Sequence, residues 1–148
     1  MANPVSEVLL TETLLEVPKA RSGLGEGAVV DFRGVVRPLE EGKKIEGLEY
    51  ETHAEMAEHQ LRLLADEAVK KFGLQLVQIH HRIGFVVAGE TSLFLRVMAP
   101  HRAEAFQASQ WLVEELKKTV PIWKKPKFVE DKVARRKTEK LLPVTLRQ

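Results

Sequence analysis

The clearest periodic signal in the sequence is helical and lies between about Ala54 and Phe72. Apolar side chains recur there at intervals of three and four residues, with charged residues between them: Met56, Ala57, Leu61, Leu64, Ala65, Ala68 and Phe72. This spacing predicts an amphipathic α-helix with one apolar face. Gly73 follows at once and is a natural helix stop. Any fold for this chain must therefore accommodate one long amphipathic helix near its middle.

Short stretches rich in β-branched and aromatic residues lie on both sides of this helix and predict strands. They cover residues 6–13, 27–37, 45–52 and 74–84, and two further strands within residues 85–100 are joined at Gly89-Glu90. Residues 38–44, PLEEGKK, are expected to form a loop. Gly34, inside the second stretch, suggests a bulge or a close backbone approach. Because strands and helices do not alternate as regular βαβ units, the sequence predicts an α+β fold.

A second helix is expected from about His101 to Thr119. Its predicted buried stripe consists of Ala105, Phe106, Ser109, Leu112, Val113 and Leu116. Val120 precedes Pro121, and a residue before proline is disfavoured in the helical region, so the helix should end there. The chain is thus expected to combine a mixed sheet with two main helices.

Positively charged residues stand at both ends of this second helix. His101 and Arg102 open it, where the helix dipole makes basic side chains unfavourable unless they share a bound anion with the free N–H groups. Lys117 and Lys118 close it, where the dipole favours cations. The alternative is that these side chains only face solvent, since the placement of surface charge has little energetic cost.

The stretch VPIWKKPK follows this helix and adds more positive charge. Pro121 and Pro126 stiffen it and Trp123 offers a large apolar anchor. Lys124 and Lys125 are therefore expected to be held in place. A lysine held near other cations is a candidate proton donor or acceptor.

Two other groups of residues could bind a ligand. Arg37 ends a predicted strand, and its planar guanidinium suits bidentate contact with phosphate, although a strand-end charge facing water is the alternative. His80 and His81 are neighbours on a predicted strand and should face opposite sides. They cannot easily share one metal, so we interpret them as structural. The sequence contains no Gly-rich phosphate loop, HExxH or GxSxG motif, and it predicts neither a metal nor a bound cofactor.

The chain has 148 residues, which fits one domain of ordinary size. We divide it into a single domain over residues 1–126 and a basic tail over residues 127–148 that is expected to be mobile. Cysteine is absent, which excludes disulfides, cysteine-based zinc sites and thiol nucleophiles. No apolar run approaches the roughly 18 residues needed to cross a bilayer. The N-terminus lacks the pattern of a secretory signal, so a cytoplasmic location is expected.

Charge is distributed unevenly along the chain. Residues 117–140 contain ten Lys or Arg and three Asp or Glu, whereas the remaining residues carry a net negative charge. Such a basic cluster suits an anionic ligand or a nucleic acid, or is a solvated tail. A non-enzymatic nucleic-acid-binding module using this basic C-terminal segment is therefore an alternative function. The few aromatic residues count against it, because they give little surface for stacking on bases.

Five segments occur here in an order typical of one family: GAVVDFRGVVR, GLEYETHAEMAE, IHHRIG, VAGE and APHRAEAFQASQWLVEELKKTVPIWKK. Over roughly residues 27–125 the sequence resembles the large, catalytic subunit of molybdopterin synthase, the MoaE family. The resemblance implies an α/β-hammerhead fold and a homodimer. Each chain of that dimer would bind one small, ubiquitin-like sulfur-carrier subunit, giving a heterotetramer.

The resemblance also implies a sulfurtransferase activity. Two sulfurs would be transferred from carrier chains that end in a Gly-Gly thiocarboxylate to cyclic pyranopterin monophosphate, making the dithiolene of molybdopterin. The absence of cysteine fits this scheme, because the sulfur arrives on the partner.

A substrate pocket follows from the same resemblance, residue by residue: Phe32, Arg37, His101, Arg102, Lys117 and Lys124, with Val35, Val36 and Lys125 lining it beside them. Arg37, His101 and Arg102 are expected to bind the phosphate and other anionic groups of the substrate. Lys117 and Lys124 are the candidates for acid-base catalysis during sulfur transfer. Their presence argues against a degenerate subunit that binds the carrier without catalysis.

Three positions depart from the family pattern. Pro126 stands where the family usually has Glu after WKK, and His53 stands where an aromatic residue is common. In the tail, Lys132 of FVEDK is the candidate counterpart of a basic residue that reaches the active site. These departures concern the rim and tail of the pocket.

The implied pocket contains both ends of the second helix, which lie far apart. His101 and Lys117 are separated by 16 residues, which corresponds to roughly 24 Å at about 1.5 Å per residue. We therefore predict that the helices of a two-fold dimer run antiparallel across its interface. His101 and Arg102 of one chain would then meet Lys117 and Lys124 of the other.

Overall fold

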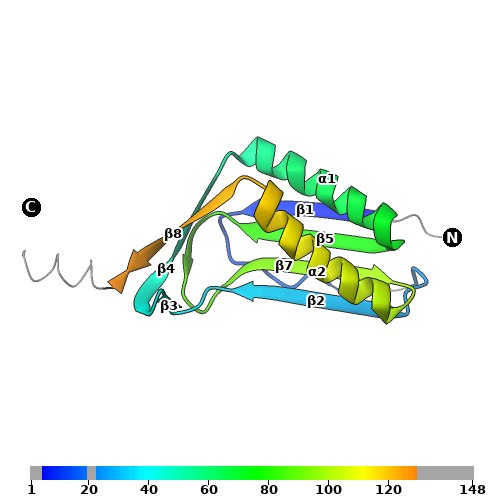
Figure 1. The fold of residues 1–148 in the computed structure, drawn as a ribbon, viewed down its shortest axis with the longest axis horizontal. Helices are drawn as coiled ribbons and strands as arrows, with labels where there is room; N and C mark the ends of the chain where they lie inside the picture. Colours follow the sequence, from blue (N-terminus) through cyan, green and yellow to red (C-terminus); the bar gives the residue numbers. More distant parts are fainter. Residues whose placement is uncertain (1–4, 20–22, 130–148) are drawn as a thin grey trace, which may run out of the picture.

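The computed structural model describes residues 5–19 and 23–129 and contains a main sheet, a smaller second sheet and two helices (Figure 1). The main sheet has the strand order β1 (Val5–Thr11), β5 (Leu76–Arg82), β7 (Thr91–Ala99) and β2 (Ala28–Val35). β1 runs parallel to β5, whereas the β5–β7 and β7–β2 pairs are antiparallel. This mixed sheet with two helices confirms the predicted α+β fold.

Helices α1 (Ala54–Phe72) and α2 (Arg102–Thr119) cover one face of the main sheet. α1 begins after His53, whose Nδ1 accepts a hydrogen bond from the Met56 N–H at 3.3 Å, and it ends at Gly73 in the left-handed conformation (φ 66°). Both predicted helix ranges are therefore confirmed. Of the described helices, neither is long and apolar enough to cross a membrane.

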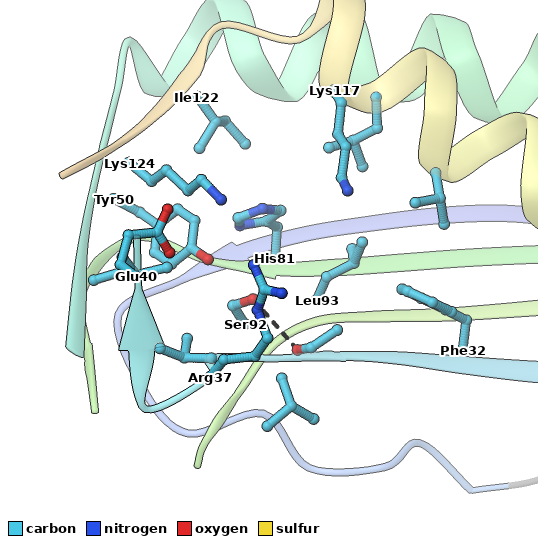
Figure 2. A pocket seen from close by; sticks show the side chains of 16 residues that line it. Phe32, Arg37, Glu40, Tyr50, His81, Ser92, Leu93, Lys117, Ile122 and Lys124 are labelled. Atoms are coloured by element: carbon cyan, nitrogen blue, oxygen red, sulfur yellow. Dashed lines mark hydrogen bonds between the residues drawn. The ribbon is translucent and has the colours of Figure 1, made fainter. Parts of the chain in front are cut away.

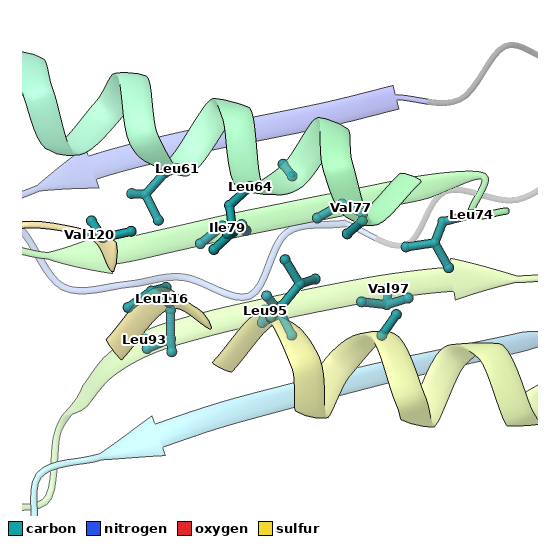
Figure 3. Close-up of a cluster of buried hydrophobic side chains, with 14 of the residues drawn as sticks. Leu61, Leu64, Leu74, Val77, Ile79, Leu93, Leu95, Val97, Leu116 and Val120 are labelled. Atoms are coloured by element: carbon teal, nitrogen blue, oxygen red, sulfur yellow. The ribbon is translucent and has the colours of Figure 1, made fainter. Parts of the chain in front are cut away.

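The apolar stripes of both helices meet the sheet in one hydrophobic core (Figure 3). Leu61 and Leu64 of α1 and Leu116 of α2 pack there against strand residues such as Ile79 and Leu95. α1 lies over β1 and β5, α2 lies over β7 and β2, and the two helices also contact each other. Burial of the two stripes thus fixes the position of each helix on the sheet.

Two residues of the predicted stripes are exposed instead of buried. Met56 is 51% exposed and Phe106 is 62% exposed, whereas their neighbours Ala57 and Ala105 are fully buried. Successive residues lie about 100° apart around a helix, and at these two positions that rotation carries the side chain out of the core. The prediction was therefore wrong at Met56 and Phe106.

The second sheet lies at one end of the main sheet and is built on β4 (Lys43–Thr52) (Figure 1). β4 pairs with β3 (Leu39–Glu40), β6 (Gly84–Val87) and β8 (Ile122–Phe128). Val36, Ile45, Leu48 and Val86 form a small core of its own.

The loop predicted over residues 38–44 is a hairpin between β3 and β4. Its turn residues, Glu41 and Gly42, have positive φ values of 52° and 77°, which is the geometry of a two-residue hairpin turn. The bulge suggested for Gly34 is confirmed, because the register between β2 and β7 shifts between Gly34 and Val35.

Strand β8 is an element that sequence analysis missed. The prediction for this segment is a stiffened stretch between two prolines. Proline cannot donate to a strand ladder and is confined to edge strands and bulges. β8 fits that restriction, since β4 is its one strand partner in the described part of the chain. β8 extends to Phe128, past the predicted domain boundary at residue 126. Residues 130–148 of the predicted tail, with Lys132, lie outside the described residues.

Gly47 of β4 stands where the second sheet has no room for a side chain. A Cβ at this position would lie 2.2 Å from the Val86 carbonyl oxygen and 2.8 Å from Cζ of Phe85. At Gly34 of β2 the nearest atom to an added Cβ is Cβ of Leu93, at 3.4 Å, which is ordinary contact. We predict that Gly47→Ala lowers the free energy of unfolding by about 1–3 kcal/mol, because β6 must move away from β4.

The matched control is Gly34→Ala, which should lower the free energy of unfolding far less, because an added methyl group has space there. Equilibrium urea unfolding of both variants measures the difference. Equal losses in the two variants would contradict the role of Gly47 in the β4–β6 contact.

Candidate active site

A pocket of about 590 Å³ opens where the main sheet, the second sheet and the C-terminal end of α2 meet (Figure 2). Apolar side chains from both sheets and α2 form its walls, among them Phe32, Leu93, Leu116 and Ile122. This volume lies in the range of sites for small organic ligands. Within the described residues no group of three metal-ligating side chains occurs.

Three positively charged side chains reach into the pocket from separate elements. Arg37 follows the end of β2, Lys117 lies in the last turn of α2, and Lys124 lies on β8. In Figure 2 they extend toward one another across the pocket. All three are exposed, so the pocket presents positive charge to a ligand that enters from solvent.

Strand alternation decides which lysine of the WKK sequence faces the pocket. Ile122 and Lys124 line it, and successive residues of a strand point to opposite faces. Lys125 therefore faces away, and its Nζ lies 3.8 Å from the Glu51 carboxylate. The prediction that Lys125 lines the pocket does not fit this chain. Trp123 is exposed, so the prediction that it forms an apolar anchor also fails within this chain.

The structure brings together six of the predicted pocket residues: Phe32, Val35, Val36, Arg37, Lys117 and Lys124. His101 and Arg102 do not join them, because they lie at the opposite end of α2 from Lys117. The His101 side chain is 80% exposed, with Nδ1 3.7 Å from the Glu104 carboxylate. A site that combines both ends of α2 therefore requires a second copy of the chain.

Sequence analysis missed four polar residues of the pocket, which are Glu40, Tyr50, His81 and Ser92. Tyr50 is the cross-strand partner of Lys124, so the recognition of β8 as a strand would have placed it here. His81 is 5% exposed, and its ring meets that of Tyr50 edge-on with 5.3 Å between the centroids. The interpretation of His81 as purely structural thus overlooked its place in the pocket.

Burial shifts the proton affinities of Tyr50 and His81 in opposite directions. Burial raises the pKa of Tyr50 above its usual 10.0, the hydrogen bond with Ser92 acts against this shift, and the Glu40 carboxylate adds to it. Burial lowers the pKa of His81 below its usual 6.5, partly opposed by the hydrogen bond to the Arg82 carbonyl. Both side chains are therefore neutral at pH 7, beneath a rim of cations.

Comparison with known proteins gives a consistent set of relatives. Residues 9–119 match the family described as MoaE protein. The molybdopterin synthase catalytic subunit of Pyrococcus abyssi is 41% identical over 104 residues, which is 70% of this chain and 70% of that protein. The molybdopterin synthase catalytic subunit of Thermoplasma volcanium is 41% identical over 99 residues, 67% of this chain and 72% of that protein.

Solved structures agree with these sequence relatives. The crystal structure of molybdopterin synthase from Staphylococcus aureus superposes with a TM-score of 0.74 at 35% identity, covering 82% of this chain and 90% of that chain. A MoaE protein from Burkholderia ambifaria superposes with a TM-score of 0.66 at 25% identity, covering 80% and 84% of the two chains.

Tyr50 is the single tyrosine of the chain, so its ionisation reports directly on the pocket. We predict a phenol titration midpoint above 10.0 in the folded chain and near 10.0 in the urea-unfolded chain. Ultraviolet absorbance follows the titration. The neutral phenol stabilises the fold below pH 10.0, and this contribution is lost as the pH rises through the folded pKa.

Two variants test the causes of the shifted pKa of Tyr50. Glu40→Gln should lower the midpoint, because a nearby negative charge is removed, and Ser92→Ala should raise it, because a hydrogen bond to the phenolate is lost. A folded midpoint at or below 10.0 would mean that Tyr50 is not held in a buried pocket.

Proposed function

The chain belongs to the MoaE protein family, and we propose that it is the catalytic subunit of a molybdopterin synthase. In this role it transfers sulfur from the C-terminal thiocarboxylate of a small ubiquitin-like carrier to cyclic pyranopterin monophosphate. The product is the dithiolene of molybdopterin. The observation that carries the proposal is the convergence of Arg37, Lys117 and Lys124 in one pocket of suitable size.

The charge of the pocket suits both reactants, because a phosphate and a thiocarboxylate are both anions. The planar guanidinium of Arg37 can hold the phosphate through two hydrogen bonds. Lys117 and Lys124 provide ammonium groups that can stabilise negative charge on the sulfur or donate a proton to a departing oxygen. The described pocket therefore supplies anion binding and acid catalysis.

The chain itself has no cysteine, so the transferred sulfur has to arrive on the carrier. A C-terminal Gly-Gly segment has no side chains and can enter a narrow pocket in an extended conformation. Basic side chains commonly capture such a peptide terminus. Membership of the MoaE family is the reason that the partner we propose is a carrier chain rather than a small sulfur donor.

We also propose that two copies of the chain share each site. His101 and Arg102 are exposed at the end of α2 that lies farthest from Lys117. Antiparallel α2 helices in a two-fold dimer would bring these residues to the pocket of the other copy, and symmetry would create two such sites. With one carrier bound to each copy, the assembly is a heterotetramer.

The alternative function, nucleic-acid binding, has less support. Residues 130–140 of the basic segment lie outside the described residues. Lys117 and Lys124, which are described, converge in a pocket rather than along an extended stripe that could follow a phosphate backbone.

The predicted cytoplasmic location stays a prediction.

The function is tested by mixing the purified chain with thiocarboxylated carrier and cyclic pyranopterin monophosphate. We expect mass spectrometry to detect the dithiolene product together with carrier that has become a carboxylate. A chain that binds the carrier but leaves its thiocarboxylate intact would contradict the proposed function.

The variant Lys117→Ala should lower dithiolene formation by at least about 100-fold, because it removes a proton donor or charge-stabilising group from the reaction. Lys117 is exposed at the end of α2, so the thermal unfolding midpoint should change little. Lys118→Ala is the matched control, since Lys118 is also exposed in the last helical turn but does not line the pocket. Near-normal turnover in Lys117→Ala would remove this residue from the catalytic group.

Subunit complementation tests the shared site. Arg102→Ala and Lys117→Ala homodimers should each be nearly inactive. Subunit exchange between them should restore part of the activity, because each heterodimer then contains one site with both residues intact. Heterodimers verified by mass that remain as inactive as the parents would contradict a site shared between two copies.

A further inference from the structure

We infer that His81 is the general base of this site and that it activates the water that frees the sulfur from its carrier. The inference rests on the proposed function and adds a catalytic residue to it. His81 lies on β5, is almost completely buried, and lines the pocket. In Figure 2 the ends of Arg37, Lys117 and Lys124 extend toward its ring.

A hydrogen bond fixes the tautomer of His81. Nδ1 lies 2.6 Å from the carbonyl oxygen of Arg82. A carbonyl oxygen can only accept a hydrogen bond, so Nδ1 carries the proton and Nε2 of the neutral ring has a free lone pair. Nε2 makes no hydrogen bond to any residue within 5–19 or 23–129. It is therefore the nitrogen that can accept a proton from a ligand in the pocket.

The surroundings hold the ring in this orientation. Arg82 is itself buried, and its guanidinium donates to Oε1 of Glu90 at 2.8 Å and to the Glu12 carbonyl at 3.2 Å. The carbonyl that orients His81 is thus part of a fixed segment. Tyr50 packs edge-on against the imidazole ring. The direction of Nε2 is therefore set before a substrate binds, as general-base catalysis requires.

The charge state of His81 also suits a base. Its pKa is lowered by burial, so the ring is unprotonated at neutral pH. The titratable groups that line the pocket around it come from the segment after β2, from β3, β4, α2 and β8: Arg37, Glu40, Tyr50, Lys117 and Lys124. Three of these are cations and one is a carboxylate, so the charged groups around the ring are of both signs.

Sulfur transfer from a thiocarboxylate needs a base in its second step. Once the carrier's sulfur has bonded to a substrate carbon, it is still bonded to the acyl carbon of the carrier, and this species is a thioester. Water must attack that acyl carbon. The new O–C bond forms, the C–S bond breaks with its electron pair on sulfur, and Nε2 takes one proton of the water. The products are the carrier's carboxylic acid, the substrate thiolate and imidazolium.

The other ionisable groups of the pocket are less suited to accept this proton. A guanidinium such as that of Arg37 cannot be deprotonated in a protein, and an ammonium such as that of Lys117 or Lys124 has no lone pair. Among the described residues that line the pocket, Glu40 is the one carboxylate, so it is the competing base. The experiment has to separate Glu40 from His81.

A single-turnover reaction followed by intact-mass spectrometry of the carrier resolves the two steps. Thiocarboxylate, pterin-linked thioester and carboxylate forms of the carrier differ in mass. In His81→Asn we expect the thioester to form at close to the wild-type rate and to decay at least about 100-fold more slowly, so that it accumulates. A residue with only a structural role would not cause this accumulation.

The chain offers a matched control in the adjacent histidine. His80 faces the opposite side of β5, where its ring lies 6.0 Å from that of Phe94. His80→Asn and Glu40→Gln should both hydrolyse the thioester at about the wild-type rate. Slow decay in Glu40→Gln combined with wild-type decay in His81→Asn would assign the base to Glu40 and overturn the inference.

Other outcomes are equally distinct. Thioester decay in His81→Asn within about threefold of wild type, or loss of both steps together in a folded variant, overturns the inference. A wild-type chain that consumes no thiocarboxylate contradicts the proposed function instead. If His81→Asn does not fold, the wild-type pH profile decides. The rate of thioester hydrolysis should be constant above pH 6.5 and should fall at lower pH, where His81 becomes protonated. The Glu40→Gln variant should show the same pH dependence. A rate that does not fall at low pH overturns the inference.

Discussion

The pairing of β8 with β4 determines which charges the pocket presents. Its antiparallel register places Lys124 opposite Tyr50 and Lys125 opposite Glu49. Because side chains alternate along a strand, only one of the two lysines can face the pocket. A register shift of one residue would turn Lys125 toward the pocket and Lys124 away from it. It would also move all the remaining side chains of β8 to the opposite face of the sheet. β4 can pair with both β6 and β8 because Gly47 has no side chain and leaves room for the β6 backbone.

The β4–β8 pair also connects the second sheet to α2, the helix that carries Lys117. Val120, which caps α2, is buried in the main core, and the hydroxyl of Thr52 at the end of β4 donates to the Pro121 carbonyl at 2.7 Å. The short connection from α2 to β8 is therefore held at both ends. Lys117 and Lys124 face one pocket because this connection turns the chain from the main sheet to the second sheet.

Local signals in the sequence were sufficient to predict the helices and most strands. They were not sufficient to predict β8 or the buried residues of the pocket. α1 could be predicted from about Ala54 to Phe72 because its periodicity and its stop at Gly73 are local signals, whereas the capping role of His53 became clear only in the structure. β8 contains Pro126, which argues against a strand, and its partner β4 is remote in sequence. Family resemblance placed Arg37 and Lys117 in a site. His81 was interpreted as structural because the side of the sheet that it faces depends on how distant segments pair.

The exposed and the buried side chains of the pocket have different chemical roles. Lys117 and Lys124 lie at the exposed rim, where a positive charge is well solvated and can bind anions. At the floor, burial disfavours charge: it raises the pKa of Tyr50 and lowers the pKa of His81, so both neutral forms are favoured. An exposed histidine changes its charge within the physiological pH range, whereas burial lowers the pKa of His81 and so favours the form that accepts a hydrogen bond. Because the nucleophilic sulfur is brought by the carrier, the chain needs no nucleophile of its own, only cations to hold two anions and a neutral base beneath them.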